Sequence, residues 1–245
     1  MAPSERERRQ ASQARLQAAG ITPPQRGGAG RGLAIGAVVL VVALAAGLYV
    51  FWQNRSAGIE PTYPVTRNGT VVAAGNPAAG VTVDIYEDYL CPGCKEVERY
   101  YGDEITTALN EGKAKVNYHT VAILDDATTP PGYSTLAGNA ALCAVDAGIW
   151  PRFHARLYAE QPAEGAAGRT AQELTAVGTE LGATGDFAGC VNRNAEAAAI
   201  TDATEAAAAD PIVAPGGRFS TPSVLLNGAK IDVQDTDWLS RAVGG

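Results

Sequence analysis

The chain has few residues that bind metals, with only two histidines and four cysteines among 245 residues. Cys91 and Cys94 form a CxxC pair, a spacing that zinc sites also use, but a structural zinc site needs four ligands. No second CxxC is present, Cys143 and Cys190 lie far apart in the sequence, and neither histidine lies at ligand spacing. These absences argue against structural zinc, and we expect neither a metal nor a cofactor.

Positive charge is scarce beyond the first 32 residues. Residues 1–32 contain six arginines and two glutamates, which gives them a net charge of +4. Because the net charge of the whole chain is −7, residues 33–245 have a net charge of −11. An acidic folded part repels phosphate backbones, which argues against nucleic acid as a partner. Residues 1–32 also lack the apolar content of a core, and we expect them to form a mobile basic tail.

Charge is absent from the 20 residues between Leu33 and Trp52. A helix of that length matches a hydrocarbon core of about 30 Å. Because the excess of arginine precedes this segment, we expect the tail in the cytoplasm and the acidic remainder on the far side of the membrane. A cleaved signal peptide is the alternative, but its apolar region is normally shorter and no clear small-x-small site follows Trp52. The sequence favours an uncleaved anchor at 33–52 and a short tether at 53–62.

One domain is expected at 63–245. Asn-Gly pairs at 68–69 and 227–228 lie between β-prone runs and predict hairpins. Residues 81–86 predict a strand, 92–112 a helix and 113–123 a second strand. Ala-rich helical segments follow near 134–147, 150–160, 170–181 and 193–208, then strands at 221–226 and 229–233 and a helix at 235–243. The predicted order is β-α-β, a helical insertion at about 130–212, and β-β-α.

The CxxC pair lies where the first of these strands ends and a helix begins. Pro92 suits the first helical position, where its missing N–H is not needed. The unpaired N–H groups and the positive end of the helix dipole favour a thiolate at Cys91, while Cys94 lies one turn deeper. We therefore predict Cys91 as the exposed nucleophile and Cys94 as the resolving thiol of a redox-active disulfide. A purely structural Cys91–Cys94 bridge is the alternative.

A strand, CPxC at a helix start, a helical insertion and Thr-Pro before a final hairpin resemble the DsbA-like branch of the thioredoxin superfamily, over residues 75–245. The resemblance implies an α/β thioredoxin-like fold, here preceded by one transmembrane helix. It also implies that Pro222 is a cis-proline facing the redox pair, and that Thr221 offers backbone hydrogen bonds to a bound substrate strand.

Two positions depart from the pattern of that family. Thioredoxin-like proteins often carry a buried acid six residues before the first redox cysteine, and here that position is Ile85. Glu87 has the same strand parity and is the candidate proton-handling acid, whereas Asp84 points to the other face. A solvated charge at the strand end is the alternative. Strongly oxidising members tend to have histidine between the cysteines, and Pro-Gly here leaves the oxidising power open.

Related proteins of this branch brace the insertion with a disulfide, which implies that Cys143 and Cys190 are bonded. Two buried free thiols are the alternative. We assign no role to His119 or His154, which we interpret as packing or surface residues. Three residues at helical spacing are expected in the core, namely Trp150, Phe153 and Leu157.

The predicted function is thiol–disulfide exchange with exported cysteine-containing proteins, most simply as an oxidase that introduces disulfides. A membrane redox partner, DsbB-like or similar to vitamin K epoxide reductase, is expected to reoxidise the pair. A reductase or isomerase, and a tethered binding or chaperone module without turnover, are the alternatives. The expected location is the cell membrane, with a single span, a cytoplasmic N-terminus and an extracytoplasmic catalytic domain.

Overall fold

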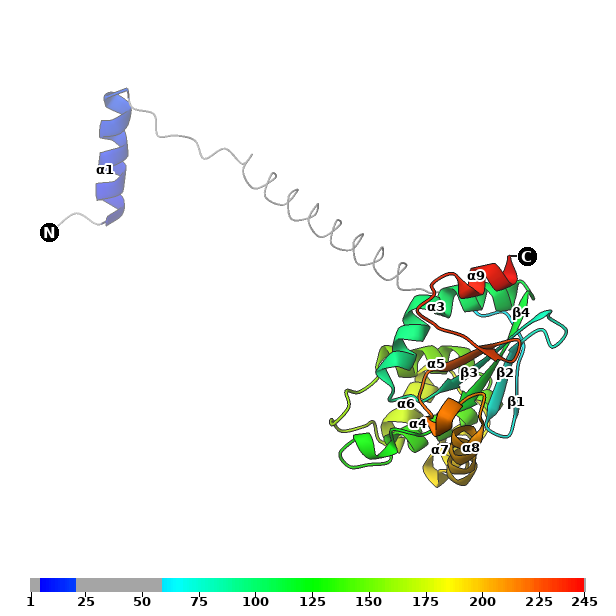
Figure 1. Ribbon diagram of the computed structural model, residues 1–245. Helices are drawn as coiled ribbons and strands as arrows, with labels where there is room; N and C mark the ends of the chain where they lie inside the picture. Colours follow the sequence, from blue (N-terminus) through cyan, green and yellow to red (C-terminus); the bar gives the residue numbers. More distant parts are fainter. Residues whose placement is uncertain (1–4, 21–58, 245) are drawn as a thin grey trace. The chain divides into compact units, whose positions relative to one another are not determined.

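The computed structural model describes residues 5–20 and 59–244 (Figure 1). The chain divides into two units, Met1–Ala57 and Gly58–Gly245. In the first, helix α1 spans Glu5–Ala18, inside the segment expected to be a mobile tail. Its Glu, Arg, Gln and Ala residues are strong helix formers, so local propensity favours the helix where no core exists.

The predicted membrane span at 33–52 and most of the tether at 53–62 lie outside the described residues. None of the helices that are described is long and apolar enough to cross a membrane.

The second unit is built on a six-stranded sheet with the order β1-β2-β4-β3-β5-β6. Strands β3 and β4 run parallel, and the other neighbouring pairs are antiparallel. The predicted order of β-α-β, helical insertion and β-β-α is confirmed. The strands are β1 (Val65–Asn68), β2 (Val71–Gly75), β3 (Val81–Glu87), β4 (Ala114–Thr120), β5 (Ser223–Leu226) and β6 (Ala229–Lys230).

Both predicted hairpins form, and one is shifted by a residue. Asn227 and Gly228 both have positive φ, 49° and 82°, as a type I′ turn requires. In the first hairpin Asn68 pairs with Val71, so the two-residue turn lies at 69–70 instead of 68–69. Only Gly69 has a positive φ there, 60°, because Asn68 stays extended within the ladder.

The long helix after the CxxC pair is α3 (Pro92–Asn110), within the predicted range of 92–112, and Gly112, with φ of 68°, follows its end. The insertion contains α4 to α8, and helix α7 was not predicted. It has only seven residues and buries only Phe187 and Val191, which is too short an apolar pattern to detect. The helices are α4 (Tyr133–Asp146), α5 (Trp150–Ala159), α6 (Ala171–Glu180), α7 (Phe187–Arg193), α8 (Ala197–Ala209) and α9 (Trp238–Val243), with short 3₁₀ turns at Asp125–Ala127 and Pro215–Gly217.

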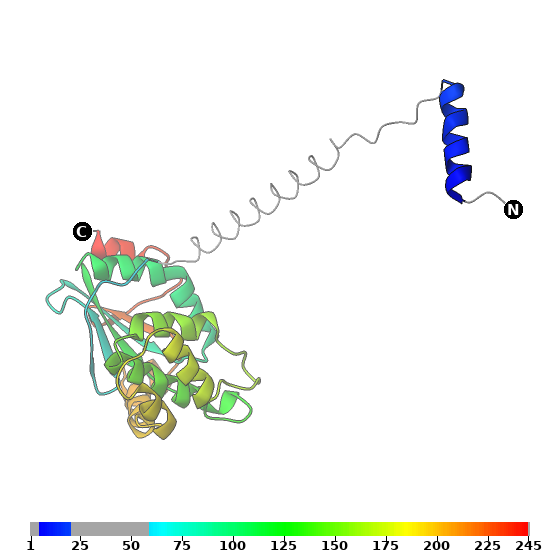
Figure 2. The ribbon, with the colours of Figure 1, turned by 180° about the vertical axis from the view of Figure 1, so that it is seen from behind.

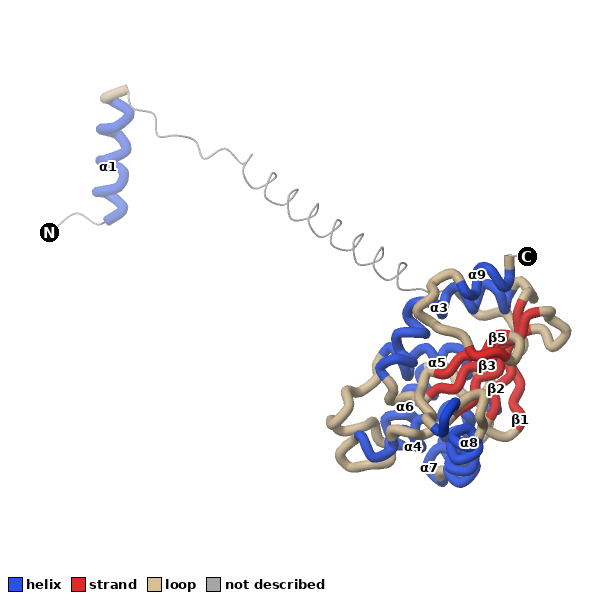
Figure 3. Tube along the Cα trace, in the orientation of Figure 1, coloured by secondary structure: helices blue, strands red, loops and turns tan. Residues whose placement is uncertain are grey.

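One face of the sheet is buried beneath helices. Figure 3 shows the strands in red beside the blue helices, and α4, α5 and α6 lie in front of the strands in the reverse view of Figure 2. In β3, Val83, Ile85 and Glu87 point to the buried face. Tyr118 of β4 contacts the ring of Trp150 in α5, with centroids 4.9 Å apart. The three predicted core residues of α5 are 2% exposed or less, which confirms that prediction.

Candidate redox site

Cys91 is the N-cap of α3 and Cys94 lies in its first turn. Both are free thiols and both are buried, 6% and 3% exposed, so the prediction that Cys91 is exposed is wrong. The Thr221–Pro222 peptide bond is cis, and the Thr221 carbonyl lies 3.2 Å from Cys91 Sγ. A Cβ at Gly93 would lie 2.9 Å from Cδ of Pro222, so the backbone between the two cysteines packs directly on that proline. The fold thus brings together groups about 130 positions apart in the sequence.

The two thiols are held in different electrostatic environments. A hydrogen bond from Cys94 lowers the pKa of Cys91 to about 6 against the effect of burial, with help from the N–H groups of Gly93 and Cys94. Burial raises the pKa of Cys94 well above its usual value, and so does the bond to Cys91. A lowered pKa at Cys91 is the shift expected for a thiol at a helix N-terminus. At neutral pH the pair therefore holds one thiolate, on Cys91, and one buried thiol.

Glu87 lies on the buried face of the sheet, behind Cys94. Its carboxylate is 3% exposed, and a cavity of about 10 Å³ is lined by Glu87, Cys94 and Glu98, among others. Ile85 lines the same cavity and supplies no proton-exchanging group. Asp84 points to the opposite face, as its strand parity predicts, and its carboxylate lies 3.0 Å from Nε2 of His119. Glu87 is therefore a buried acid beside Cys94.

His154 is buried against Glu87, in agreement with the interpretation of a packing residue, but its polar partner was not predicted. Its Nε2 lies 2.9 Å and 3.1 Å from the two carboxylate oxygens of Glu87, and the residue as a whole is 4% exposed. Its sequence position carried a signal, since His154 falls on the same helical stripe as Trp150 and Tyr158. A histidine within an apolar stripe needs a buried polar partner. His119 is half-buried and stacks on Tyr86.

The comparisons with known proteins agree with this geometry. The family described as Thioredoxin matches residues 67–244. The chain belongs to the thioredoxin family. It is a DsbA-like thiol–disulfide oxidoreductase. The predicted α/β thioredoxin-like fold with a helical insertion is confirmed.

Two solved structures illustrate this relationship. Mycobacterium tuberculosis DsbA in its oxidised form is 26% identical, with a TM-score of 0.57 over 74% of this chain and 98% of the other. MdbA from Corynebacterium matruchotii, a thiol–disulfide oxidoreductase, is 24% identical, with a TM-score of 0.65 over 76% of this chain and 94% of the other, and supports the fold.

A curated relative of a different kind also matches. The serine/threonine-protein kinase PknE of Mycobacterium tuberculosis is 31% identical over 179 residues, which are 71% of this chain. The chain spans only 31% of the length of that kinase.

Asp88 is a second buried acid of this thioredoxin-like site, and it was not predicted from the sequence. Its carboxylate accepts hydrogen bonds from the N–H of Leu90 (2.8 Å), the N–H of Leu124 (2.9 Å) and the hydroxyl of Ser134 (2.7 Å). Its carbonyl accepts from the N–H of Cys91 at 3.0 Å. Burial raises the pKa of Asp88, and these bonds oppose that effect. The signal in the sequence was an Asx turn, because an aspartate at a strand end can bond the N–H two residues on.

The second cysteine pair lies away from the redox site. Cys143 of α4 and Cys190 of α7 form a disulfide, with their Cα atoms 6.0 Å apart. The bond joins two helices of the insertion, so Cys91 and Cys94 are the free thiols of the chain. Within residues 5–20 and 59–244, no three His, Cys, Asp or Glu side chains are grouped to hold a metal ion.

Proposed function

We propose that this oxidoreductase introduces disulfide bonds into exported proteins by exchange through Cys91 and Cys94. The observation that carries the proposal is the pKa of Cys91, lowered to about 6. A thiolate stabilises the reduced form of the pair, and a stable reduced form makes its disulfide a stronger oxidant. Relative to a thiol of pKa 9.0, this stabilisation at pH 7 is at most about 1.4 kcal/mol, or about 30 mV for a two-electron couple.

The reaction begins from the Cys91–Cys94 disulfide. A client thiolate attacks Sγ of Cys91, the Cys91–Cys94 bond breaks, and Cys94 leaves as a thiolate. A second client thiolate then attacks the client sulfur of the mixed disulfide and releases the Cys91 thiolate. The client loses two electrons and gains a disulfide, while the protein gains two electrons as one thiolate and one thiol. Thr221 and Pro222 lie beside Cys91 and would hold the client strand through the backbone of Thr221.

Cys94 must gain a proton when it leaves and lose it when the pair is reoxidised, because its raised pKa makes the buried thiolate unfavourable. Glu87 is the group we assign to this exchange. Its carboxylate shares a cavity with Cys94, and that cavity has about the volume that one water molecule needs.

We place the catalytic domain on the extracytoplasmic side of the cell membrane, anchored by residues 33–52, with the N-terminus in the cytoplasm. The uncharged segment and the arginines before it support this topology. A membrane partner, DsbB-like or similar to vitamin K epoxide reductase, would take the two electrons from the reduced pair.

Trapping clients on Cys91 tests the proposal. In Cys94→Ser the Cys91 thiolate can still attack a disulfide of an exported protein, and the mixed disulfide should accumulate because Cys94 is no longer there to attack Cys91 and release the client. Cys91→Ala should abolish both trapping and client oxidation. A reduction potential as low as that of reducing thioredoxins, about −270 mV, would favour a reductase or isomerase instead. Full activity of Cys91→Ala in cells would favour a binding module without turnover.

A further inference from the structure

Three ionisable side chains from three different elements meet behind Cys94. Glu87 ends β3, Glu98 lies on α3, and His154 lies on α5. His154 Nε2 is 2.9 Å from the carboxylate of Glu87, and His154 Nδ1 is 3.9 Å from Oε2 of Glu98. The two ring nitrogens of one histidine therefore face two different carboxylates. Such a ring can take up a proton at one nitrogen and release it from the other.

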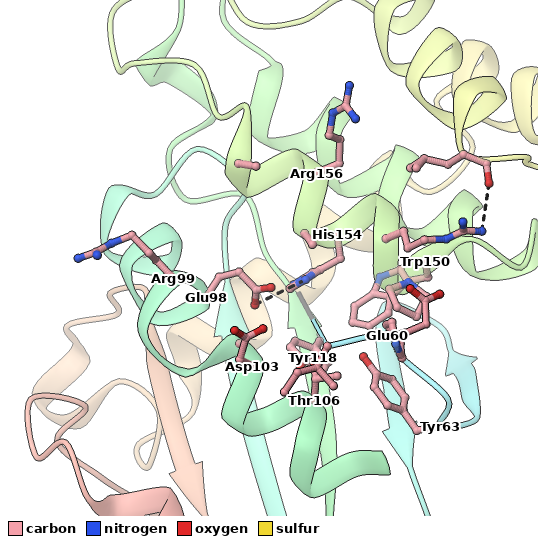
Figure 4. A pocket seen from close by; sticks show the side chains of 18 residues that line it. Glu60, Tyr63, Glu98, Arg99, Asp103, Thr106, Tyr118, Trp150, His154 and Arg156 are labelled. Carbon is pink, nitrogen blue, oxygen red and sulfur yellow. Dashed lines mark hydrogen bonds and ion pairs between the residues drawn. The ribbon is translucent and has the colours of Figure 1, made fainter. Parts of the chain in front are cut away.

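The group connects the redox pair with the surface. At the inner end, the cavity of about 10 Å³ is bounded by Cys94, Glu87 and Glu98. At the outer end, His154 and Glu98 line a pocket of about 450 Å³ between α3 and α5 (Figure 4). Figure 4 shows the Glu98 carboxylate pointing toward the His154 ring, with Asp103 close by. The side chain of Glu98 is 25% exposed, against 5% for His154 and 4% for Glu87, so access to water increases along the group.

The other groups around His154 do not exchange protons near neutral pH. The rings of Tyr89, Tyr118, Trp150 and Tyr158 lie 4.7–5.7 Å from the ring of His154, centroid to centroid. Burial raises the pKa of the three tyrosines well above 10, so they remain neutral. No lysine or arginine forms an ion pair with Glu87 or Glu98 within the described part of the chain.

The pKa values of His154 and Glu98 are both raised. Burial lowers the pKa of His154, but the charges of Glu87 and Glu98 outweigh burial and raise it. Burial raises the pKa of Glu98, although the charge of His154 opposes this. Both groups therefore hold a proton to a higher pH than the free side chains do.

We propose that Glu87, His154 and Glu98 form a proton relay between the sulfur of Cys94 and the pocket between α3 and α5. The relay rests on the proposed exchange function and specifies the path of one proton. When Cys94 leaves as a thiolate, Glu87 delivers a proton across the small cavity, His154 reprotonates Glu87 from Nε2, and Glu98 reprotonates His154 at Nδ1. Glu98 regains its proton from water in the pocket. Reoxidation of the pair runs the same transfers in reverse, and no electrons move through the relay.

The experiment isolates the step in which Cys94 is deprotonated. The reduced protein is mixed with oxidised glutathione between pH 5 and 8, quenched in acid and resolved by mass into reduced, mixed-disulfide and disulfide forms. Formation of the mixed disulfide depends on Cys91, and its resolution depends on Cys94. We expect Glu98→Gln and His154→Gln to slow resolution at least tenfold near pH 6.5 and to change its pH profile, with the first step unchanged.

Two further variants serve as controls. Glu98→Asp restores the carboxylate and should resolve the mixed disulfide within about threefold of the wild-type rate. His119→Gln removes the other histidine–carboxylate pair, on the opposite face of the sheet, and should behave as wild type. If His154→Gln does not fold, the comparison of Glu98→Gln with Glu98→Asp decides alone, since Glu98 lies at the pocket surface.

Wild-type resolution rates and pH profile in Glu98→Gln would overturn the relay. So would equal slowing in Glu98→Gln and Glu98→Asp. Neither result affects the exchange function, because Cys91, Cys94 and Glu87 are intact in these variants and trapping of clients by Cys94→Ser tests that function separately.

Discussion

Replacing Cys94 by alanine should raise the pKa of Cys91 above about 6. The hydrogen bond from the Cys94 thiol makes the largest contribution to the lowered pKa of Cys91, ahead of burial, which opposes it. Alanine removes this donor and leaves the N–H groups of residues 93 and 94 in place. Serine keeps a donor at the same position, so Cys94→Ala and Cys94→Ser form a matched pair.

The size of the effect follows from the strength of such bonds. A hydrogen bond to a charged group contributes about 1.5–3 kcal/mol, and a thiol is a weak donor, so a value near the lower end applies. A free energy of about 1.4 kcal/mol corresponds to a shift of one pKa unit, so the pKa of Cys91 should be near 7 in Cys94→Ala. At pH 6 the thiolate fraction would then fall from about one half to about one tenth, and at pH 8.5 the two proteins would differ little.

Alkylation with iodoacetamide at graded pH, followed by peptide mass analysis, measures the thiolate fraction of Cys91. We expect alkylation at pH 6 to be about fivefold slower in Cys94→Ala than in the wild-type protein, and Cys94→Ser to retain an inflection near 6. Identical profiles for the two variants would refute the role of the Cys94 donor and leave the helix N-terminus as the main cause. Preferential labelling of Cys94 in the wild-type protein would refute the assignment of Cys91 as the nucleophile.

Three further outcomes are expected. Replacing both Cys143 and Cys190 by alanine should lower the free energy of unfolding by about 4 kcal/mol in the chain-entropy model for their sequence separation of 47, and an unchanged urea midpoint would contradict a structural role. Because the pKa of Cys91 is lowered in the folded state, the Cys91 thiolate stabilises the reduced protein fully above pH 9, and this stabilisation disappears as the pH falls through about 6. Urea unfolding of the reduced and oxidised forms at pH 5 and 8 should show that the reduced form loses stability relative to the oxidised form at pH 5. Protease added to spheroplasts should remove the folded domain if residues 33–52 anchor it outside, whereas protection of the domain would reverse the proposed topology.

Residues close together in the sequence carried most of what could be predicted. Residues 81–87 alternate between buried and half-buried positions as a strand does, and Pro92 follows Cys91 at the start of α3. Val97, Tyr101 and Ile105 recur at helical spacing after the CxxC pair, and all three are buried on one face of that helix. Such features depend on backbone propensity and on periodic side-chain direction, which neighbouring residues determine.

The short elements could not be predicted, because neighbouring residues alone do not determine them. Helix α7 has too few residues for a periodic pattern, and its burial comes from packing with α4 and α6. The first hairpin turn lies one residue later than predicted. The pairing of β1 with β2 and of β2 with β4 determines the register of this hairpin, and the Asn-Gly pair alone does not.

The strand, the CxxC pair and the helix that places Cys91 at its N-terminus could be predicted, since they form within one continuous segment. The 3.2 Å contact of the Thr221 carbonyl with Cys91 Sγ and the 2.9 Å contact of His154 with Glu87 exist only in the assembled fold. These partners are 130 and 67 positions apart, and their meeting depends on how the sheet orders its strands and how α5 packs on it. A buried histidine and a buried carboxylate each need a partner, but composition and spacing do not say which one, because packing alone brings them within hydrogen-bond distance.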